Sequence, residues 1–174
     1  MSQHPYLSSE DSLMLRKAVE SYSGGACLEI GAGNCGTIVA LTKSFDLTVG
    51  TDLVRPGNAD WEGGKSEIVI ADTATCFVSE SFDLVVFNPP YLPSSVIEDR
   101  AVDGGRGGVE VPLRFLREAL RVVKRSGKVV MVLSSHSLIA EIELECARMN
   151  VRVRRTSEKE LFFERLYVLE ASRD

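Results

Sequence analysis

The sequence has no long apolar run and no paired cysteines, and these absences exclude several classes of protein. None of its apolar stretches approaches the roughly 18 residues that a membrane-spanning helix needs, so no membrane segment is expected. The first residues have neither the basic region nor the apolar stretch of a signal peptide, which predicts a cytoplasmic protein. The cysteines form no C-x-x-C pair, so buried thiols are expected and no metal site is predicted. They are Cys27, Cys35, Cys76 and Cys146.

The chain also lacks the basic excess of proteins that grip long nucleic acids. Its net charge is −5. Residues 1–110 carry 7 Lys and Arg against 16 Asp and Glu, giving −9, whereas residues 111–174 carry 13 against 9, giving +4. Phosphate contacts supply most of the affinity for nucleic acid. The charge balance therefore argues against a nucleic-acid partner.

No linker rich in Pro, Gly or Ser divides the 174 residues, so we expect a single domain over residues 1–174 that opens with a helical segment in residues 1–22. Short β-branched runs alternate with helical patterns, which predicts an α/β fold: a mostly parallel seven-stranded sheet, an antiparallel C-terminal edge strand and helices on both faces. The expected strands are Ala26–Ile30, Asp46–Thr51, Glu67–Ile70, Phe82–Phe87, Lys128–Leu133, Val151–Arg155 and Leu161–Glu170. The expected helices are Ser9–Ser21, Cys35–Ser44, Val111–Lys124 and Ser137–Met149.

A glycine-rich turn follows the first expected strand. Gly31, Gly33 and Gly36 let the backbone turn tightly and approach a ligand closely. The spacing G-x-G-x-x-G alone is shared with dinucleotide-binding folds. Glu29 separates the two cases, because a carboxylate there would repel a pyrophosphate but suits a cationic ligand such as a methionine ammonium. The alternative is a tight strand–helix turn without a ligand.

Two further carboxylates follow the next two expected strands. Asp52 lies 19 residues after Gly33, where its two oxygens could accept hydrogen bonds from both ribose hydroxyls. Asp72 ends the third strand and could accept from an adenine amine. Both lie at the carboxyl ends of strands, where open α/β sheets place their ligands. For Asp52 an exposed turn residue is the alternative interpretation.

The most informative stretch is Asn88-Pro89-Pro90-Tyr91, which follows an apolar strand. The two prolines have fixed φ and donate no hydrogen bond, so they form a stiff loop with carbonyls free to accept. The Asn88 side-chain oxygen and the Pro89 carbonyl could then accept both hydrogens of a substrate –NH₂, while Tyr91 stacks on the planar group. With the cofactor turn upstream, this predicts methyl transfer from a sulfonium to a planar nitrogen. A simple strand-terminating turn is the alternative.

In order and spacing, these motifs resemble the class I methyltransferases of the HemK/PrmC group, and the resemblance implies their Rossmann-like fold. Three features are similar to the short archaeal and eukaryotic branch of that group, which methylates N5 of the glutamine in the Gly-Gly-Gln motif of class 1 release factors. They are the N-terminal run Tyr6-Leu7-Ser8-Ser9-Glu10-Asp11-Ser12, the glycine-rich Asp103–Gly108 and the late run Glu160–Leu166. Ser8 and Ser12 depart from the proline and threonine that are frequent there, but the Ser12 hydroxyl can still reach the cofactor's carboxylate.

The resemblance implies S-adenosylmethionine as cofactor, with S-adenosylhomocysteine as product, and a set of site residues. The implied cofactor-binding residues are Tyr6, Ser12, Glu29, Gly31, Ala32, Gly33, Asp52, Leu53, Asp72, Thr73 and Asn88. The implied catalytic residues are Asn88, Pro89 and Tyr91, and Pro90 joins them in binding substrate. We expect residues 92–110 to form a mobile lid on the acceptor side.

The resemblance also implies two protein partners. One is the class 1 release factor as substrate, and the other is a small zinc-binding activator subunit that pairs with a sheet edge. In the family topology that edge is the apolar strand Ile68-Val69-Ile70, and an exposed apolar edge calls for a cover.

Two other functions remain open from the sequence alone. A DNA or RNA amino-methyltransferase acting on adenine or cytosine would share the Asn-Pro-Pro-Tyr motif, since a base amine poses the same chemical problem. The acidic pI of about 5.2 and the lack of a target-recognition domain argue against it. An inactive cofactor-binding interaction module would have a spoiled acceptor motif, and here that motif is intact.

Overall fold

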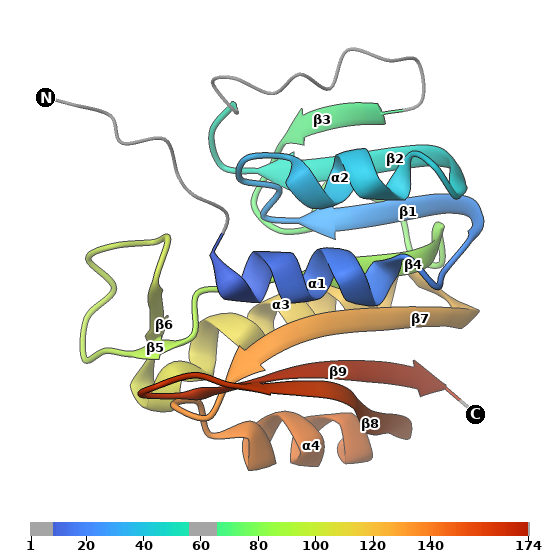
Figure 1. The fold of residues 1–174 in the computed structure, drawn as a ribbon. Helices are drawn as coiled ribbons and strands as arrows, with labels where there is room; N and C mark the ends of the chain where they lie inside the picture. Colours follow the sequence, from blue (N-terminus) through green and yellow to red (C-terminus); the bar gives the residue numbers. More distant parts are fainter. Residues whose placement is uncertain (1–8, 56–65, 174) are drawn as a thin grey trace, which may run out of the picture.

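The computed structural model describes residues 9–55 and 66–173, which form one seven-stranded sheet with helices on both faces (Figure 1). The strand order is β3-β2-β1-β4-β7-β9-β8. The bounds are β1 Gly24–Ile30, β2 Phe45–Asp52, β3 Ser66–Ile70, β4 Phe82–Phe87, β7 Val123–Ser134, β8 Val151–Glu160 and β9 Arg165–Arg173. The predicted fold class is confirmed. Within the described ranges, no helix is long and apolar enough to cross a membrane.

Five strands run parallel, and the C-terminal strand β9 is antiparallel to both of its neighbours, β7 and β8. The antiparallel strand that the sequence predicts at the edge therefore lies one place inside it, and β8 forms the edge. The last strand begins at Arg165 instead of Leu161 because residues 161–164 form the hairpin turn, where the Leu161 N–H donates to the Glu164 carbonyl at 2.8 Å.

Four helices cover the two faces of the sheet: α1 Glu10–Val19, α2 Gly36–Leu41, α3 Glu110–Val122 and α4 Ile139–Arg148. Residues of α1 and α2, among them Leu15 and Leu41, pack in one cluster with β4 and β7. Residues of α3 and α4 pack in a second cluster on the other face. The four helices that the sequence predicts are all present, each shorter than its predicted range. The third, α3, begins one residue earlier than predicted and ends at Val122, because β7 begins at Val123.

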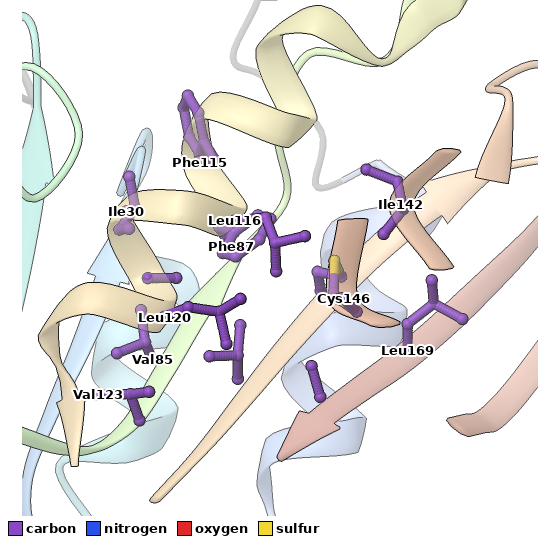
Figure 2. Close-up of a cluster of buried hydrophobic side chains, with 14 of the residues drawn as sticks. Ile30, Val85, Phe87, Phe115, Leu116, Leu120, Val123, Ile142, Cys146 and Leu169 are labelled. Carbon is purple, nitrogen blue, oxygen red and sulfur yellow. The ribbon is translucent and has the colours of Figure 1, made fainter. Parts of the chain in front are cut away.

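The second cluster explains why α3 lies across the middle of the sheet. Leu116 and Leu120 of α3 are fully buried over Val85 and Phe87 of β4, and Phe115 lies beside them (Figure 2). Burying a leucine side chain contributes about 1.5–3 kcal/mol. A central strand that is apolar on both faces and a helix with one apolar face thus fix each other's position.

Candidate active site

The register of the three central strands brings separate sequence motifs into one row. Ile30 of β1 pairs with Thr51 of β2 on one side and with Phe87 of β4 on the other. The next residues along these strands are Gly31, Asp52 and Asn88, the predicted cofactor turn, ribose carboxylate and acceptor asparagine. Because neighbouring strands lie about 4.8 Å apart, all three backbones lie within roughly 10 Å of one another. They occupy the carboxyl edge of the parallel strands.

The glycine turn is fastened to the end of β2. The N–H groups of Gly31 and Ala32 donate to the Thr51 carbonyl at 2.8 and 2.9 Å, and the Gly33 N–H donates to Oδ2 of Asp52 at 2.9 Å. Gly31 and Gly33 have φ values of 74° and 50°, a region that side chains disfavour. The turn therefore needs glycine at both positions, as the sequence predicts.

Glu29 lies beneath this turn instead of facing outward. Its side chain is 5% exposed, and its Oε2 accepts the Ile38 N–H at 3.1 Å at the start of α2. Burial raises the pKa of Glu29 to about 8, and hydrogen bonds from Thr37 and Ile38 oppose that rise only in part. The carboxyl thus joins the glycine turn to α2. Its part in binding a cationic cofactor stays a prediction, and the structure directs its oxygens at the protein.

Asp52 keeps accepting capacity although both of its oxygens have partners. Oδ1 accepts the Val54 N–H at 3.2 Å, and Oδ2 accepts the Gly33 N–H. Each carboxylate oxygen has a second lone pair, so two further donors can be accommodated. Leu53, the next residue, is exposed beside it. The arrangement is compatible with a pair of ribose hydroxyls.

Asp72 is already engaged by an arginine. Nη1 of Arg114 donates to Oδ2 of Asp72 at 2.9 Å, and both side chains are about half exposed. Exposed pairs of this kind contribute little stability. Thr73 is buried at a φ of 54°, and its hydroxyl donates to the Asp72 carbonyl. An adenine contact at Asp72 and Thr73 stays a prediction.

Asn88 has one side-chain atom, Oδ1, that makes no hydrogen bond with the described residues. Oδ1 of Asn88 is buried, and no hydrogen-bond partner for it exists within the described residues. A buried acceptor without a donor costs about 1–3 kcal/mol, which a ligand donor would recover. Nδ2 of Asn88 lies 3.5 Å from the Ser12 hydroxyl. The structure thus brings the predicted residues Ser12 and Asn88 together, whereas Tyr6 lies outside the described residues.

Tyr91 is held at both its backbone and its side chain. Its hydroxyl donates to Oδ2 of Asp11 at 3.0 Å, and its carbonyl accepts the Ser137 hydroxyl at 3.1 Å. Pro89 is buried and Pro90 is half-buried between Asn88 and Tyr91. The stiffness that the two prolines predict is therefore reinforced by contacts from α1 and from the start of α4.

Asp11 belongs to the N-terminal run that resembles the family, but the sequence assigns it no role in the site. Its Oδ1 accepts the Ser12 N–H at 2.6 Å and the Ser9 hydroxyl. Burial alone would raise the pKa of Asp11, but hydrogen bonds from Ser9, Asn88, Tyr91 and Ser12 outweigh it and hold the pKa below its ordinary value. In the sequence Asp11 looks like a first-turn helix residue, and only packing places it against Asn88 and Tyr91.

The glycine-rich run Asp103–Gly108 packs directly on the acceptor motif. An added Cβ would lie 2.8 Å from the Tyr91 backbone at Gly104 and 2.2 Å from the Tyr91 carbonyl oxygen at Gly108. The run comprises β6 Asp103–Gly105 and the short 3₁₀ helix η1 Arg106–Gly108. Gly104 and Gly108 are therefore required by the close approach of two backbones.

Residues 92–110 are held together by strand pairing and hydrogen bonds within the segment. Its short strand β5 Leu92–Pro93 pairs with β6, and the Asp103 carboxylate accepts the N–H groups of Glu98 and Asp99 at 2.9 and 2.8 Å. The sequence predicts a lid here without this local structure. Its position beside Tyr91 agrees with an acceptor-side segment, and its motion stays a prediction.

The site thus combines two chemically distinct halves at one sheet edge. The glycine turn and Asp52 offer a close backbone surface and acceptors for hydroxyl groups. Asn88 offers a buried carbonyl-type oxygen to which no group in the described part of the chain donates, next to the Pro89 backbone. Such a pair of halves suits a nucleoside-bearing ligand on one side and an –NH₂ group on the other.

Comparison with known proteins assigns the chain to a family. No family model matches it. A Methanocaldococcus jannaschii protein named "putative protein N5-glutamine methyltransferase" is 30% identical over 185 residues, which cover 98% of this chain and 93% of that protein. The release factor glutamine methyltransferase of Caulobacter vibrioides is 36% identical over 132 residues, which cover 64% of this chain and 46% of that protein.

A solved structure agrees with these relatives. It is the Mtq2–Trm112 complex of E. cuniculi, which is responsible for the methylation of the eRF1 translation termination factor. A chain of this complex superposes with a TM-score of 0.78 at 25% identity, covering 97% of our chain and 98% of its own. The Rossmann-like class I methyltransferase fold and the HemK/PrmC resemblance are both confirmed. The chain belongs to the family of protein N5-glutamine methyltransferases.

Proposed function

We propose that the protein transfers a methyl group from S-adenosylmethionine to N5 of the glutamine in the Gly-Gly-Gln motif of a class 1 translation release factor. The observation that carries the proposal is the buried Oδ1 of Asn88, directly after β4, which has no hydrogen-bond partner among residues 9–55 and 66–173. Such an oxygen lacks a hydrogen-bond donor, and the –NH₂ group of a substrate amide can supply one. The relatives named for glutamine and release-factor methylation support the choice of acceptor.

The residues present fit the cofactor. The positive-φ glycines Gly31 and Gly33 leave room for close approach, and Asp52 retains a free lone pair on each oxygen. S-adenosylmethionine supplies a methyl group that its sulfonium already activates, and S-adenosylhomocysteine is the product. We assign its binding to the glycine turn (Gly31, Ala32, Gly33), Glu29, Asp52, Leu53, Asp72, Thr73, Ser12, Tyr6 and Asn88.

The chain's own contribution to catalysis is orientation and charge. An amide nitrogen is a poor nucleophile because its lone pair is delocalised into the carbonyl. Hydrogen bonds to Oδ1 of Asn88 and to the Pro89 carbonyl draw density onto that nitrogen, and they strengthen as positive charge builds on it. The Tyr91 ring orients the amide plane. In-line positioning of this kind can lower a barrier by about 7–11 kcal/mol in well-oriented model reactions.

The competing functions have less support. A base amino-methyltransferase needs the same acceptor motif, but the relatives that cover most of this chain are named for protein glutamine. An inactive interaction module would have no use for the unpaired oxygen at Asn88, whose burial without a partner costs stability.

A second subunit belongs to the proposal. β3 is the first strand of the sheet, and within residues 9–55 and 66–173 no strand pairs with its outer side. Ile70 on β3 is 54% exposed, and Val54 near the end of β2 is exposed as well. The solved relative forms a complex with Trm112. We propose that a small zinc-binding subunit covers this edge.

The test uses the chain with and without that subunit, labelled S-adenosylmethionine, and a release factor or its Gly-Gly-Gln→Gly-Gly-Ala variant. We expect label on the intact factor only. Asn88→Ala should abolish transfer while the cofactor still binds. Label on nucleic acid, or label that survives the glutamine substitution, would refute the proposed acceptor.

A further inference from the structure

An asparagine amide presents two different groups, and only one orientation of Asn88 can serve an –NH₂ acceptor. With Oδ1 toward the substrate, the oxygen accepts a hydrogen bond from the substrate nitrogen. With Nδ2 toward the substrate, a donor faces a donor. The two orientations fill nearly the same space, so a neighbour of Asn88 must choose between them.

The neighbour is Asp11, in the first turn of α1. An ionised carboxylate can only accept hydrogen bonds. The Asn88 side chain is among the donors that lower the pKa of Asp11, and Nδ2 of Asn88 lies 3.5 Å from Oγ of Ser12, the residue next to Asp11. Reversing the amide would place two acceptors against each other. Nδ2 therefore faces Ser12 and Asp11, and Oδ1 is left buried with no partner within the described part of the chain.

The same carboxylate fixes Tyr91. The Tyr91 hydroxyl donates to Oδ2 of Asp11 at 3.0 Å, so the ring is tied to α1 at its far end. Asp11 is itself held, because Oδ1 accepts the Ser12 N–H at 2.6 Å and the Ser9 hydroxyl. One side chain of α1 thus holds both ends of the run Asn88–Tyr91.

We propose that Asp11 is the positioning residue of the acceptor site, which sets the orientation of the Asn88 amide and of the Tyr91 ring. The kinetic tests use a release factor as the methyl acceptor, and that choice rests on the proposed function. The contacts of Asp11 are independent of it. The four hydrogen bonds that lower the pKa of Asp11 also keep it ionised at neutral pH, as an acceptor-only role requires.

The central test is Asp11→Asn. The new amide can donate to Oδ1 of Asn88, which would turn that oxygen away from the substrate. We expect kcat for methyl transfer to the release factor to fall at least tenfold, with the Kd for cofactor changed less than twofold. The matched control is Glu10→Gln, because Glu10 is the adjacent acid of α1 and pairs with Lys159 at 2.5 Å on the exposed surface. We expect that control to retain kcat.

Asp11→Glu separates positioning from packing. Asparagine has the shape of aspartate, whereas glutamate keeps the charge but is one methylene longer. A positioning role predicts a higher kcat for Asp11→Glu than for Asp11→Asn, and a packing role predicts the reverse. In a Tyr91→Phe background, which lacks the hydroxyl that Asp11 holds, Asp11→Asn should lower kcat by a smaller factor than in the wild type, because the two residues act as one unit. Additive losses would overturn the proposal, as would a loss of cofactor affinity equal to the loss of kcat.

A measurement without substrate distinguishes this proposal from the proposed function. The side-chain NH₂ signals of Asn88 in the ¹⁵N NMR spectrum of the cofactor-bound protein should shift in Asp11→Asn and stay unchanged in Glu10→Gln. Unchanged signals in Asp11→Asn refute the role of Asp11. Shifted signals in a protein that methylates no release factor support Asp11 and refute only the proposed substrate.

Discussion

The α-carbon of Gly108 lies against the carbonyl of Tyr91, so closely that a Cβ on Gly108 would lie 2.2 Å from that oxygen. Real Cβ atoms do not approach an oxygen to this distance, so one of the two backbones would have to move. The glycine-rich run thereby sets the position of the acceptor tyrosine from outside the motif. Gly107 beside it offers a matched comparison.

We predict that Gly108→Ala reduces methyl transfer at least tenfold, whereas Gly107→Ala reduces it by less than threefold. The two glycines have nearly equal φ values of 66° and 65°, so the strain of a left-handed alanine, about 1–2 kcal/mol, is common to both. They differ in what a Cβ meets: the Tyr91 backbone at Gly108, and the flexible end of Leu138 at Gly107. Steady-state kinetics and thermal unfolding of both variants check this. Equal activity losses would contradict it.

A second prediction compares the contributions of Asp52 and Asp72 to cofactor binding. Asp52→Ala should weaken cofactor binding by at least tenfold, because hydrogen bonds to a charged group contribute about 1.5–3 kcal/mol and the Gly33 N–H also loses its partner. Asp72→Ala should weaken it by a few-fold only, since Asp72 is half exposed and already paired with Arg114. Calorimetric titration with S-adenosylhomocysteine measures both. A larger loss at Asp72 would show that it, and not Asp52, dominates recognition.

The buried Glu29 predicts an unusual dependence of stability on pH. Its pKa is raised in the folded protein to about 8 from an ordinary 4.5, so folding favours the protonated form. Its contribution is fully present below about pH 4.5 and is lost as the pH rises through about 8. The slope can reach about 1.4 kcal/mol per pH unit.

The check compares the free energy of unfolding of the wild type and of Glu29→Gln between pH 5 and 8. The wild type should lose stability relative to the variant as the pH rises, because glutamine does not titrate. Groups whose pKa values are lowered, such as Asp11 and Glu170, act at lower pH and in the opposite direction. A constant difference across this range would mean that Glu29 is ionised in the folded protein.

The β3 edge gives a fourth prediction. Ile70→Lys should abolish co-purification of the small partner subunit, because a charged side chain on an edge strand opposes strand addition and desolvation. Leu144→Lys, on α4 at the opposite end of the sheet and 51% exposed, should leave the complex intact. Co-expression followed by size-exclusion chromatography measures both. Retention of the complex by Ile70→Lys would place the partner elsewhere.

The sequence by itself determined the order of strands and helices, the glycine turn and the acceptor motif. These features are local: β-branched runs, glycines at positive φ and two consecutive prolines restrict the backbone wherever they occur. The residues that follow Asn88 in the chain were therefore enough to predict that Asn88 binds the methyl-accepting group. The carboxyl-end location of Asp52 followed from the parallel topology.

Only the tertiary structure decided how these pieces serve one another. It turned Glu29 inward onto α2, paired Asp72 with Arg114, and placed Asp11 against Asn88 and Tyr91, some 80 residues away in the sequence. Burial and the choice of hydrogen-bond partner depend on which elements pack together, and a helix residue carries no local sign of a partner on a distant strand. The sequence thus predicts Asn88 as the group that receives the substrate, and only the fold brings Asp11, its proposed positioning residue, beside it.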